Sequence, residues 1–150
     1  MSESSPLSTD SPSPATPGKL RDVRVLVVDD NEDTLDLIAI ALESEGARVM
    51  QAASVPAAMS IVLGNRLDVL VSDIGMPGED GYDLMRRLRA DGSSARGLPA
   101  VAVTAFGARE DRLKALAVGF QEHLQKPFDA ASLVDVVARL ATGMPPQNGA

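Results

Sequence analysis

Four short runs of residues in this sequence, three of them apolar, each end in residues whose side chains could take part in chemistry. Asp29 and Asp30 follow the first of these runs, Asp73 the second, Thr104 the third and Lys126 the fourth. Three carboxylates brought together would raise one another's pKa unless a cation lay between them. A hard divalent cation, Mg²⁺ above all, binds carboxylate and carbonyl oxygens. With a hydroxyl and an ammonium group beside it, such a centre would suit transfer of a phosphoryl group to a carboxylate.

The segments that would position these residues alternate between short apolar runs and helical periodicity. Apolar runs predict strands at residues 23–28, 68–72 and 99–103, and the alternation predicts two further short strands at residues 48–51 and 121–124. Apolar spacing and stop signals predict helices at residues 35–42, 54–63, 82–90, 108–118 and 133–140. This alternation predicts an α/β fold whose parallel sheet is covered on both faces. Five strands favour the flavodoxin-like (βα)5 doubly wound arrangement, with strand order 2-1-3-4-5.

In an open sheet of this kind, ligands bind beyond the carboxyl ends of the strands, so the fold would gather the polar residues at one rim. Taken singly, they have ordinary structural interpretations: a helix N-cap for Asp30, a turn residue for Asp73, a strand residue for Thr104 and a solvated surface lysine for Lys126. Their joint occurrence at four separate strand ends favours a functional site.

Composition and charge exclude several classes of protein. The chain of 150 residues contains no cysteine, which excludes disulfide scaffolds, thiolate metal sites and cysteine nucleophiles. A formal net charge of −7 disfavours nucleic acid and anionic membranes as partners. No apolar run is long enough to span a bilayer, and the N-terminus does not resemble a signal peptide. We therefore expect a cytoplasmic protein.

The chain is expected to form one domain with two terminal segments. Residues 1–19 are rich in serine and proline and predict a disordered tail. Residues 142–150 predict a flexible C-terminal tail, which leaves 20–141 as the domain. Because no helix-turn-helix would fit after Leu140, a DNA-binding regulator is not expected.

Four motifs give the sequence a specific family resemblance. They are Val27-Val28-Asp29-Asp30-Asn31, Val71-Ser72-Asp73-Ile74-Gly75-Met76-Pro77-Gly78-Glu79-Asp80-Gly81, Val103-Thr104-Ala105 and Gln125-Lys126-Pro127-Phe128. Over residues 22–140 the chain resembles the receiver domain of response regulators, the phospho-acceptor module of two-component and phosphorelay signalling. The resemblance implies a stand-alone response regulator with no output domain, rather than a conventional enzyme.

The resemblance also implies a role for the acidic residues. Asp73 would accept a phosphoryl group from a phosphohistidine of a sensor histidine kinase or a histidine phosphotransfer protein. Asp29 and Asp30 would position Mg²⁺, together with a carboxylate oxygen of Asp73 and the backbone carbonyl of Gly75. The domain would thereby support its own phosphorylation.

A switch is implied by the same resemblance. Thr104 and Lys126 would contact the phosphoryl oxygens, and the loop that begins at Ala105 would be drawn in with the threonine. The face formed by the fourth helix, fifth strand and fifth helix would then present two arrangements to a downstream protein target. We expect a monomer, with this face as the alternative route to a dimer. The peptide bond between Lys126 and Pro127 is expected to be cis, as in the family.

Three positions depart from the family pattern. His123 stands where the family usually has tyrosine or phenylalanine. It is either a structural or surface residue, or a switch residue that adds pH sensitivity, since imidazole titrates near neutrality. Gly75 and Phe106 occupy the two positions that tune self-dephosphorylation, and neither side chain orients a water molecule through a polar group. We therefore expect slow hydrolysis of the aspartyl phosphate, over minutes or longer.

Two apolar residues of the first predicted helix lie opposite its core-facing stripe. Leu37 and Ile40 are therefore expected to be exposed, unless a neighbouring helix covers them. By resemblance, this helix is where a receiver commonly docks its histidine-bearing helical partner, so the pair is a candidate docking patch.

Other functions compete with the phospho-acceptor hypothesis. A binding or scaffold module of the same fold would act without phosphorylation, but the complete set of rim residues argues against it. A Mg²⁺-dependent phosphatase with an aspartate nucleophile would need Asp-x-Asp after the first strand, whereas Asn31 lies two positions after Asp29. A flavodoxin would need a phosphate-binding loop where this chain is acidic.

Overall fold

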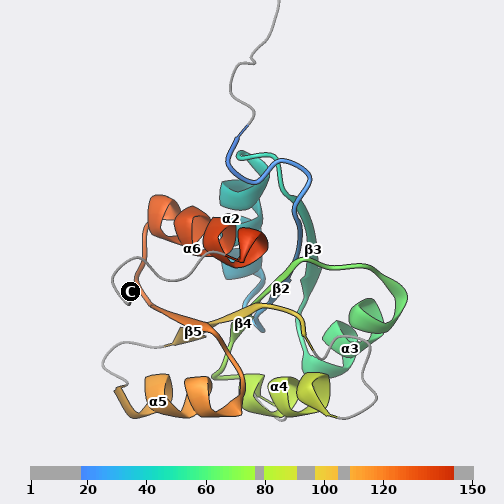
Figure 1. Ribbon diagram of the computed structural model, residues 1–150, viewed down its shortest axis with the longest axis vertical. Helices are drawn as coiled ribbons and strands as arrows, with labels where there is room; N and C mark the ends of the chain where they lie inside the picture. The colour runs from blue at the N-terminus through green and yellow to red at the C-terminus, as the bar shows by residue number, and fades with distance from the viewer. Residues whose placement is uncertain (1–17, 77–79, 91–96, 105–108, 144–150) are drawn as a thin grey trace, which may run out of the picture.

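The computed structural model of the protein describes residues 18–76, 80–90, 97–104 and 109–143, of which 109–111 are described by their backbone alone. Within these residues, five strands alternate along the chain with five helices (Figure 1). The strands are β2 (Arg24–Val28), β3 (Arg48–Ala52), β4 (Val69–Asp73), β5 (Ala100–Thr104) and β6 (Glu122–Gln125). The helices are α2 (Glu32–Glu43), α3 (Val55–Gly64), α4 (Gly81–Arg89), α5 (Arg109–Val118) and α6 (Ala130–Thr142).

The strands form one parallel sheet in the order β3-β2-β4-β5-β6. In chain order this is 2-1-3-4-5, which confirms the predicted flavodoxin-like fold. Two helices begin earlier than their apolar spacing predicts, because caps rather than buried residues set their first turns. The side chain of Asn31 accepts a hydrogen bond from the Thr34 N–H at 3.0 Å, and α2 begins at Glu32. Asp129 caps α6 in the same way at Ser132, with a distance of 2.7 Å.

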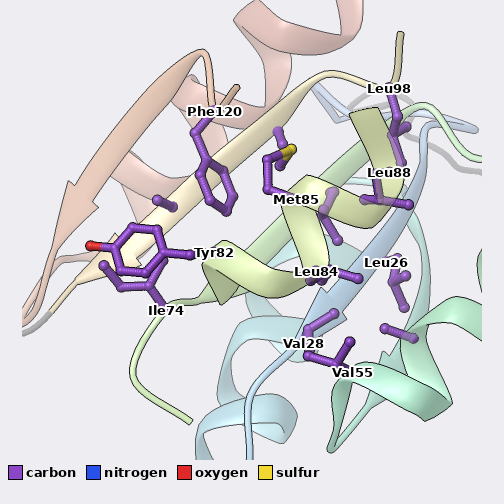
Figure 2. Packing of buried hydrophobic residues seen from close by; sticks show 14 of the residues in the cluster. Leu26, Val28, Val55, Ile74, Tyr82, Leu84, Met85, Leu88, Leu98 and Phe120 are labelled. Atoms are coloured by element: carbon purple, nitrogen blue, oxygen red, sulfur yellow. The ribbon is translucent and has the colours of Figure 1, made fainter. Parts of the chain in front are cut away.

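Each face of the sheet has its own apolar cluster because side chains alternate along a strand. Leu26 and Val28 of β2 belong to the cluster covered by α3, α4 and α5. Figure 2 shows Leu84 and Leu88 of α4 packed into this cluster. Val25 and its neighbours on alternate positions belong to the second cluster, beneath α2 and α6 (Figure 1). Because helices cover both faces of the sheet, a polar site must lie at the ends of the strands.

A short N-terminal turn closes the second cluster at the amino ends of the strands. Leu20 is fully buried, and its backbone N–H donates to the carbonyl of Glu45 at 2.9 Å. The Lys19 ammonium lies 3.2 Å from Asp135 Oδ1 on α6. Gly18 and Lys19, which the sequence assigned to the N-terminal tail, therefore belong to this turn. Residues 1–17 and 144–150 lie outside the described residues.

None of the helices in the described ranges combines the length and the apolar character needed to cross a membrane.

Candidate functional site

The sheet brings the predicted polar residues to one edge. Asp29 directly follows β2, Asp73 ends β4, Thr104 ends β5 and Lys126 directly follows β6. Because β2, β4, β5 and β6 are consecutive in the parallel sheet, their carboxyl ends lie in a row. Four residues from distant parts of the chain therefore meet at the edge where doubly wound folds bind their ligands.

Three carboxylates form the acidic part of this site. Asp29, Asp30 and Asp73 each offer an oxygen, and these oxygens all lie within 4.8 Å of one another. The backbone N–H of Asn31 donates to Asp29 Oδ1 at 2.9 Å, and that of Gly75 donates to Asp73 Oδ1 at 3.0 Å. These two hydrogen bonds orient the carboxylates. Such a cluster of oxygen donors could hold a divalent cation.

Lys126 reaches into the same cluster. Its Nζ lies 3.3 Å from Asp29 Oδ2 and 3.6 Å from Asp73 Oδ2. Its backbone N–H donates to the carbonyl of Thr104 at 2.8 Å, which ties the lysine to the end of β5. The peptide bond between Lys126 and Pro127 is cis, as predicted. The ammonium group thus lies against two of the three carboxylates.

Burial perturbs the pKa of one of these carboxylates. Asp29 is almost completely buried, and this desolvation raises its pKa above the usual value. The negative charge of Asp73 raises the pKa further, whereas the Asn31 N–H and Lys126 lower it. The ionised form of Asp29 is therefore costly, and a second positive charge at the cluster would be favourable.

His123 contacts the residue that the sequence predicts to bind phosphoryl oxygens. Its Nε2 lies 2.6 Å from Oγ1 of Thr104, whose side chain is completely buried. His123 itself is half-buried on β6. The sequence left this histidine open between a structural or surface residue and a switch residue. In the structure, the imidazole ring of His123 lies within hydrogen-bonding distance of the Thr104 hydroxyl, so it is in direct contact with a residue of the site.

Gly81 is a residue of the site to which the sequence analysis assigned no role. A Cβ placed on it would lie 2.6 Å from the carbonyl oxygen of Asp73 and 2.7 Å from the Cα of Ile74. Only glycine therefore lets the first turn of α4 approach the end of β4. The signal was present in the motif after Asp73, where a glycine follows an N-cap aspartate, Asp80.

Two predicted residues of the site, Ala105 and Phe106, lie outside the described residues. Gly75 lies two positions after Asp73 and contributes the N–H described above.

An apolar surface lies beside the rim. Leu37 and Ile40 of α2 are 69% and 64% exposed. Leu37 also lines a hollow of about 700 Å³ between α2 and the start of α6. It is lined by Thr34, Leu37, Ile38, Ala41, Lys126, Pro127, Phe128, Ala130 and Leu133. Lys126 therefore lines the hollow and also contacts the carboxylates.

Comparisons with known proteins agree with this geometry. Residues 25–138 match the family model of the response regulator receiver domain. The chain is 40% identical over 127 residues to an uncharacterized 14.6 kDa protein of Leptolyngbya boryana, with 85% of this chain and 96% of that protein covered. It is 31% identical over 110 residues to the phosphate regulon transcriptional regulatory protein PhoB of Pseudomonas aeruginosa, with 73% of this chain covered but only 48% of PhoB. The structure of the chemotaxis response regulator CheY4 of Vibrio cholerae superimposes with a TM-score of 0.73 at 27% identity, covering 79% of this chain and 98% of CheY4.

Proposed function

The chain belongs to the response regulator receiver domain family, and on this basis we propose that it is phosphorylated on Asp73 by a phosphohistidine of a sensor histidine kinase or a histidine phosphotransfer protein. One observation carries the proposal: the carboxylates of Asp29, Asp30 and Asp73 cluster within 4.8 Å of one another, with Lys126 beside them. A phosphoryl group needs both a nucleophilic carboxylate and positive charge around its oxygens.

In the proposed reaction, a carboxylate oxygen of Asp73 attacks the phosphorus in line. The phosphorus–oxygen bond forms as the phosphorus–nitrogen bond breaks, and the imidazole of the partner leaves. The Gly75 N–H, 3.0 Å from Asp73 Oδ1, orients the nucleophile. The Lys126 ammonium and the Thr104 hydroxyl bind the phosphoryl oxygens. Mg²⁺, held by the three aspartates and the backbone carbonyl of Gly75, would supply neutralisation of the remaining negative charge.

The proposal is tested by incubating the protein with acetyl phosphate and measuring its intact mass. One added phosphoryl group is expected with Mg²⁺ and none in EDTA, and the adduct should be removed by hydroxylamine because it is an acyl phosphate. Absence of the adduct in Mg²⁺, followed by absence with a panel of phosphorylated histidine kinases, would favour the phosphorylation-independent binding module instead.

Replacement of Asp29 with asparagine should distinguish two effects of this carboxylate on protein stability, the cost of burying its charge and the gain from binding Mg²⁺. Because burial raises the pKa of Asp29, the folded protein holds this proton more tightly than the unfolded chain does. Ionised Asp29 therefore lowers stability above its folded pKa, and the penalty disappears as the pH falls to the ordinary value. In EDTA at pH 7, Asp29→Asn is expected to unfold at a higher temperature than the wild type.

In Mg²⁺ the wild type, rather than Asp29→Asn, should unfold at the higher temperature. At 100 times its Kd, a ligand that binds only the folded state adds about 2.7 kcal/mol to the free energy of unfolding. The wild type should show this gain, and Asp29→Asn should show little of it. Thermal unfolding of both proteins, with and without Mg²⁺ and at several pH values, checks the prediction. Equal stabilisation by Mg²⁺ in both proteins would remove Asp29 from the metal site.

The lifetime of the phosphorylated state should be long. Gly75 has no side chain with which to orient a water molecule for attack on the phosphoryl group. We expect the isolated phosphoprotein to decay over minutes or longer, as followed by intact mass after removal of the phosphodonor. Decay within seconds, with no phosphatase present, would contradict this expectation.

The apolar surface beside the rim is proposed as the docking site for the histidine-bearing partner. The exposed side chain of Leu37 lines the same hollow as Lys126, and Ile40 is exposed on the same helix, so a partner seated there would be close to Asp73. Leu37→Glu is expected to lower kcat/KM for phosphotransfer from the partner by about tenfold or more, the effect of losing a central apolar contact.

Leu63→Glu is the matched control for this prediction. Leu63 is 72% exposed but lies on α3, which covers the other face of the sheet. Its replacement should leave phosphotransfer unchanged, and both variants should react normally with acetyl phosphate. Equal kcat/KM values for Leu37→Glu and the wild type would remove the docking assignment.

Phosphorylation is proposed to act on the face formed by α5, β6 and α6. The new phosphoryl group would draw Thr104 and the loop that follows it toward Asp73. A downstream protein target would then distinguish two arrangements of this face.

A further inference from the structure

The proposed phosphorylation of Asp73 assigns no role to the hydrogen bond between Thr104 and His123. Oγ1 of Thr104 and Nε2 of His123 are 2.6 Å apart, and the threonine side chain is completely buried. Backbone pairing holds the two residues in place, because Ala102 is the register partner of His123 and Thr104 that of Gln125. The contact is therefore part of the packed sheet rather than a chance approach of two surface groups.

A threonine hydroxyl has one hydrogen to donate and two lone pairs with which to accept. If its hydrogen is donated to a phosphoryl oxygen, the Thr104 oxygen can only accept from His123. The Nε2 atom of His123 must then carry a hydrogen, as it does in one of the two neutral tautomers and in the charged form. A phenylalanine ring has no group that could play this part.

We propose that His123 is a positioning residue for phosphoryl binding: its Nε2–H donates to Thr104 Oγ1 and directs the Thr104 hydrogen toward the phosphoryl group. This inference rests on the proposed phosphorylation of Asp73. His123 acts through Thr104 and does not itself touch the phosphoryl group. The histidine thereby fixes the orientation of a hydroxyl that would otherwise rotate.

The inference is tested with beryllofluoride in the presence of Mg²⁺, a stable mimic of the phosphoryl group on aspartate. Its affinity is measured by calorimetry for the wild type, His123→Phe, His123→Gln, Thr104→Val and the double variant Thr104→Val/His123→Phe. Loss of one hydrogen bond predicts about three- to tenfold weaker binding for His123→Phe. His123→Gln, whose amide can donate, should remain within about twofold of the wild type.

The double variant distinguishes positioning from a purely structural role. If His123 acts through the Thr104 hydroxyl, His123→Phe should have no further effect once that hydroxyl is removed. A second readout is the imidazole ¹⁵N spectrum, which distinguishes a protonated from an unprotonated Nε2. His123 is the only histidine in the sequence, so the signals are unambiguous. They should show a protonated Nε2 when beryllofluoride is bound.

Three results would overturn the inference: wild-type affinity in His123→Phe, an equal loss in the Thr104→Val background, or an unprotonated Nε2 with beryllofluoride bound. Failure of the wild type to bind beryllofluoride would instead remove the proposed phosphorylation, and this inference with it.

Discussion

Asparagine in place of Asp73 is expected to give a folded protein that takes up no phosphoryl group from acetyl phosphate or from a phosphohistidine partner. In the wild type the Gly75 N–H donates to Asp73 Oδ1 at 3.0 Å. The carboxamide oxygen of asparagine can accept the same hydrogen bond, so the backbone at Gly75 should keep its conformation. It offers no anionic oxygen to attack phosphorus. Intact-mass time courses in Mg²⁺ should show complete loss of the adduct.

Asp135→Asn provides the matched control. Asp135 is an exposed aspartate of α6 whose carboxylate pairs with Lys19 rather than with the cluster. The same chemical change at this position should leave the rate and extent of phosphorylation at wild-type values. An adduct of normal yield on Asp73→Asn would show that another residue is the acceptor.

Replacement of Lys126 with glutamine is expected to produce two effects of opposite sign. The Lys126 ammonium lies 3.3 Å from Asp29 Oδ2 and 3.6 Å from Asp73 Oδ2, where a phosphoryl group would also meet it. Loss of a charged hydrogen-bond donor should slow phosphorylation by about tenfold to a hundredfold. The same ammonium repels a cation at the carboxylates, so Mg²⁺ should bind about fivefold more tightly to the variant.

Phosphorylation rates and Mg²⁺ titrations measured on the same samples check both effects. Lys19→Gln, which removes an exposed ammonium paired with Asp135, should change neither quantity. Weaker Mg²⁺ binding in Lys126→Gln would mean that the lysine supports the cation site rather than competing with it.

The sequence predicted the fold because the three central strands are short and apolar, and because clear helical periodicity separates the strands. Leu26 and Val28 alternate with Val25 and Val27 across the two faces of β2, a pattern that a buried parallel strand requires. The gathering of Asp29, Asp73, Thr104 and Lys126 followed from that topology alone, since parallel strands end at one edge.

Contacts that depend on side-chain conformation or on close packing could not be predicted. The sequence shows a histidine on the last strand, but which way its ring points depends on the packing around it. It therefore left the role of His123 open, whereas the ring lies 2.6 Å from Thr104. The glycine after Asp80 is visible in the motif, but how closely α4 approaches the end of β4, where Gly81 cannot carry a side chain, depends on the packing of the helix. The complete burial of Leu20 could not be predicted either, because this residue directly follows a polar segment.

The turn that holds Leu20 lies at the amino ends of the strands, opposite the carboxyl ends where the rim residues meet. A label or surface tether attached at Gly18 would therefore lie at the end of the sheet opposite the rim, which suits binding assays on immobilised protein. Shortening the chain to begin at Asp22 would remove Leu20 and open a cavity beneath α2 and α6. A shortened chain for such assays should therefore begin at Gly18 or earlier, so that Leu20 is kept.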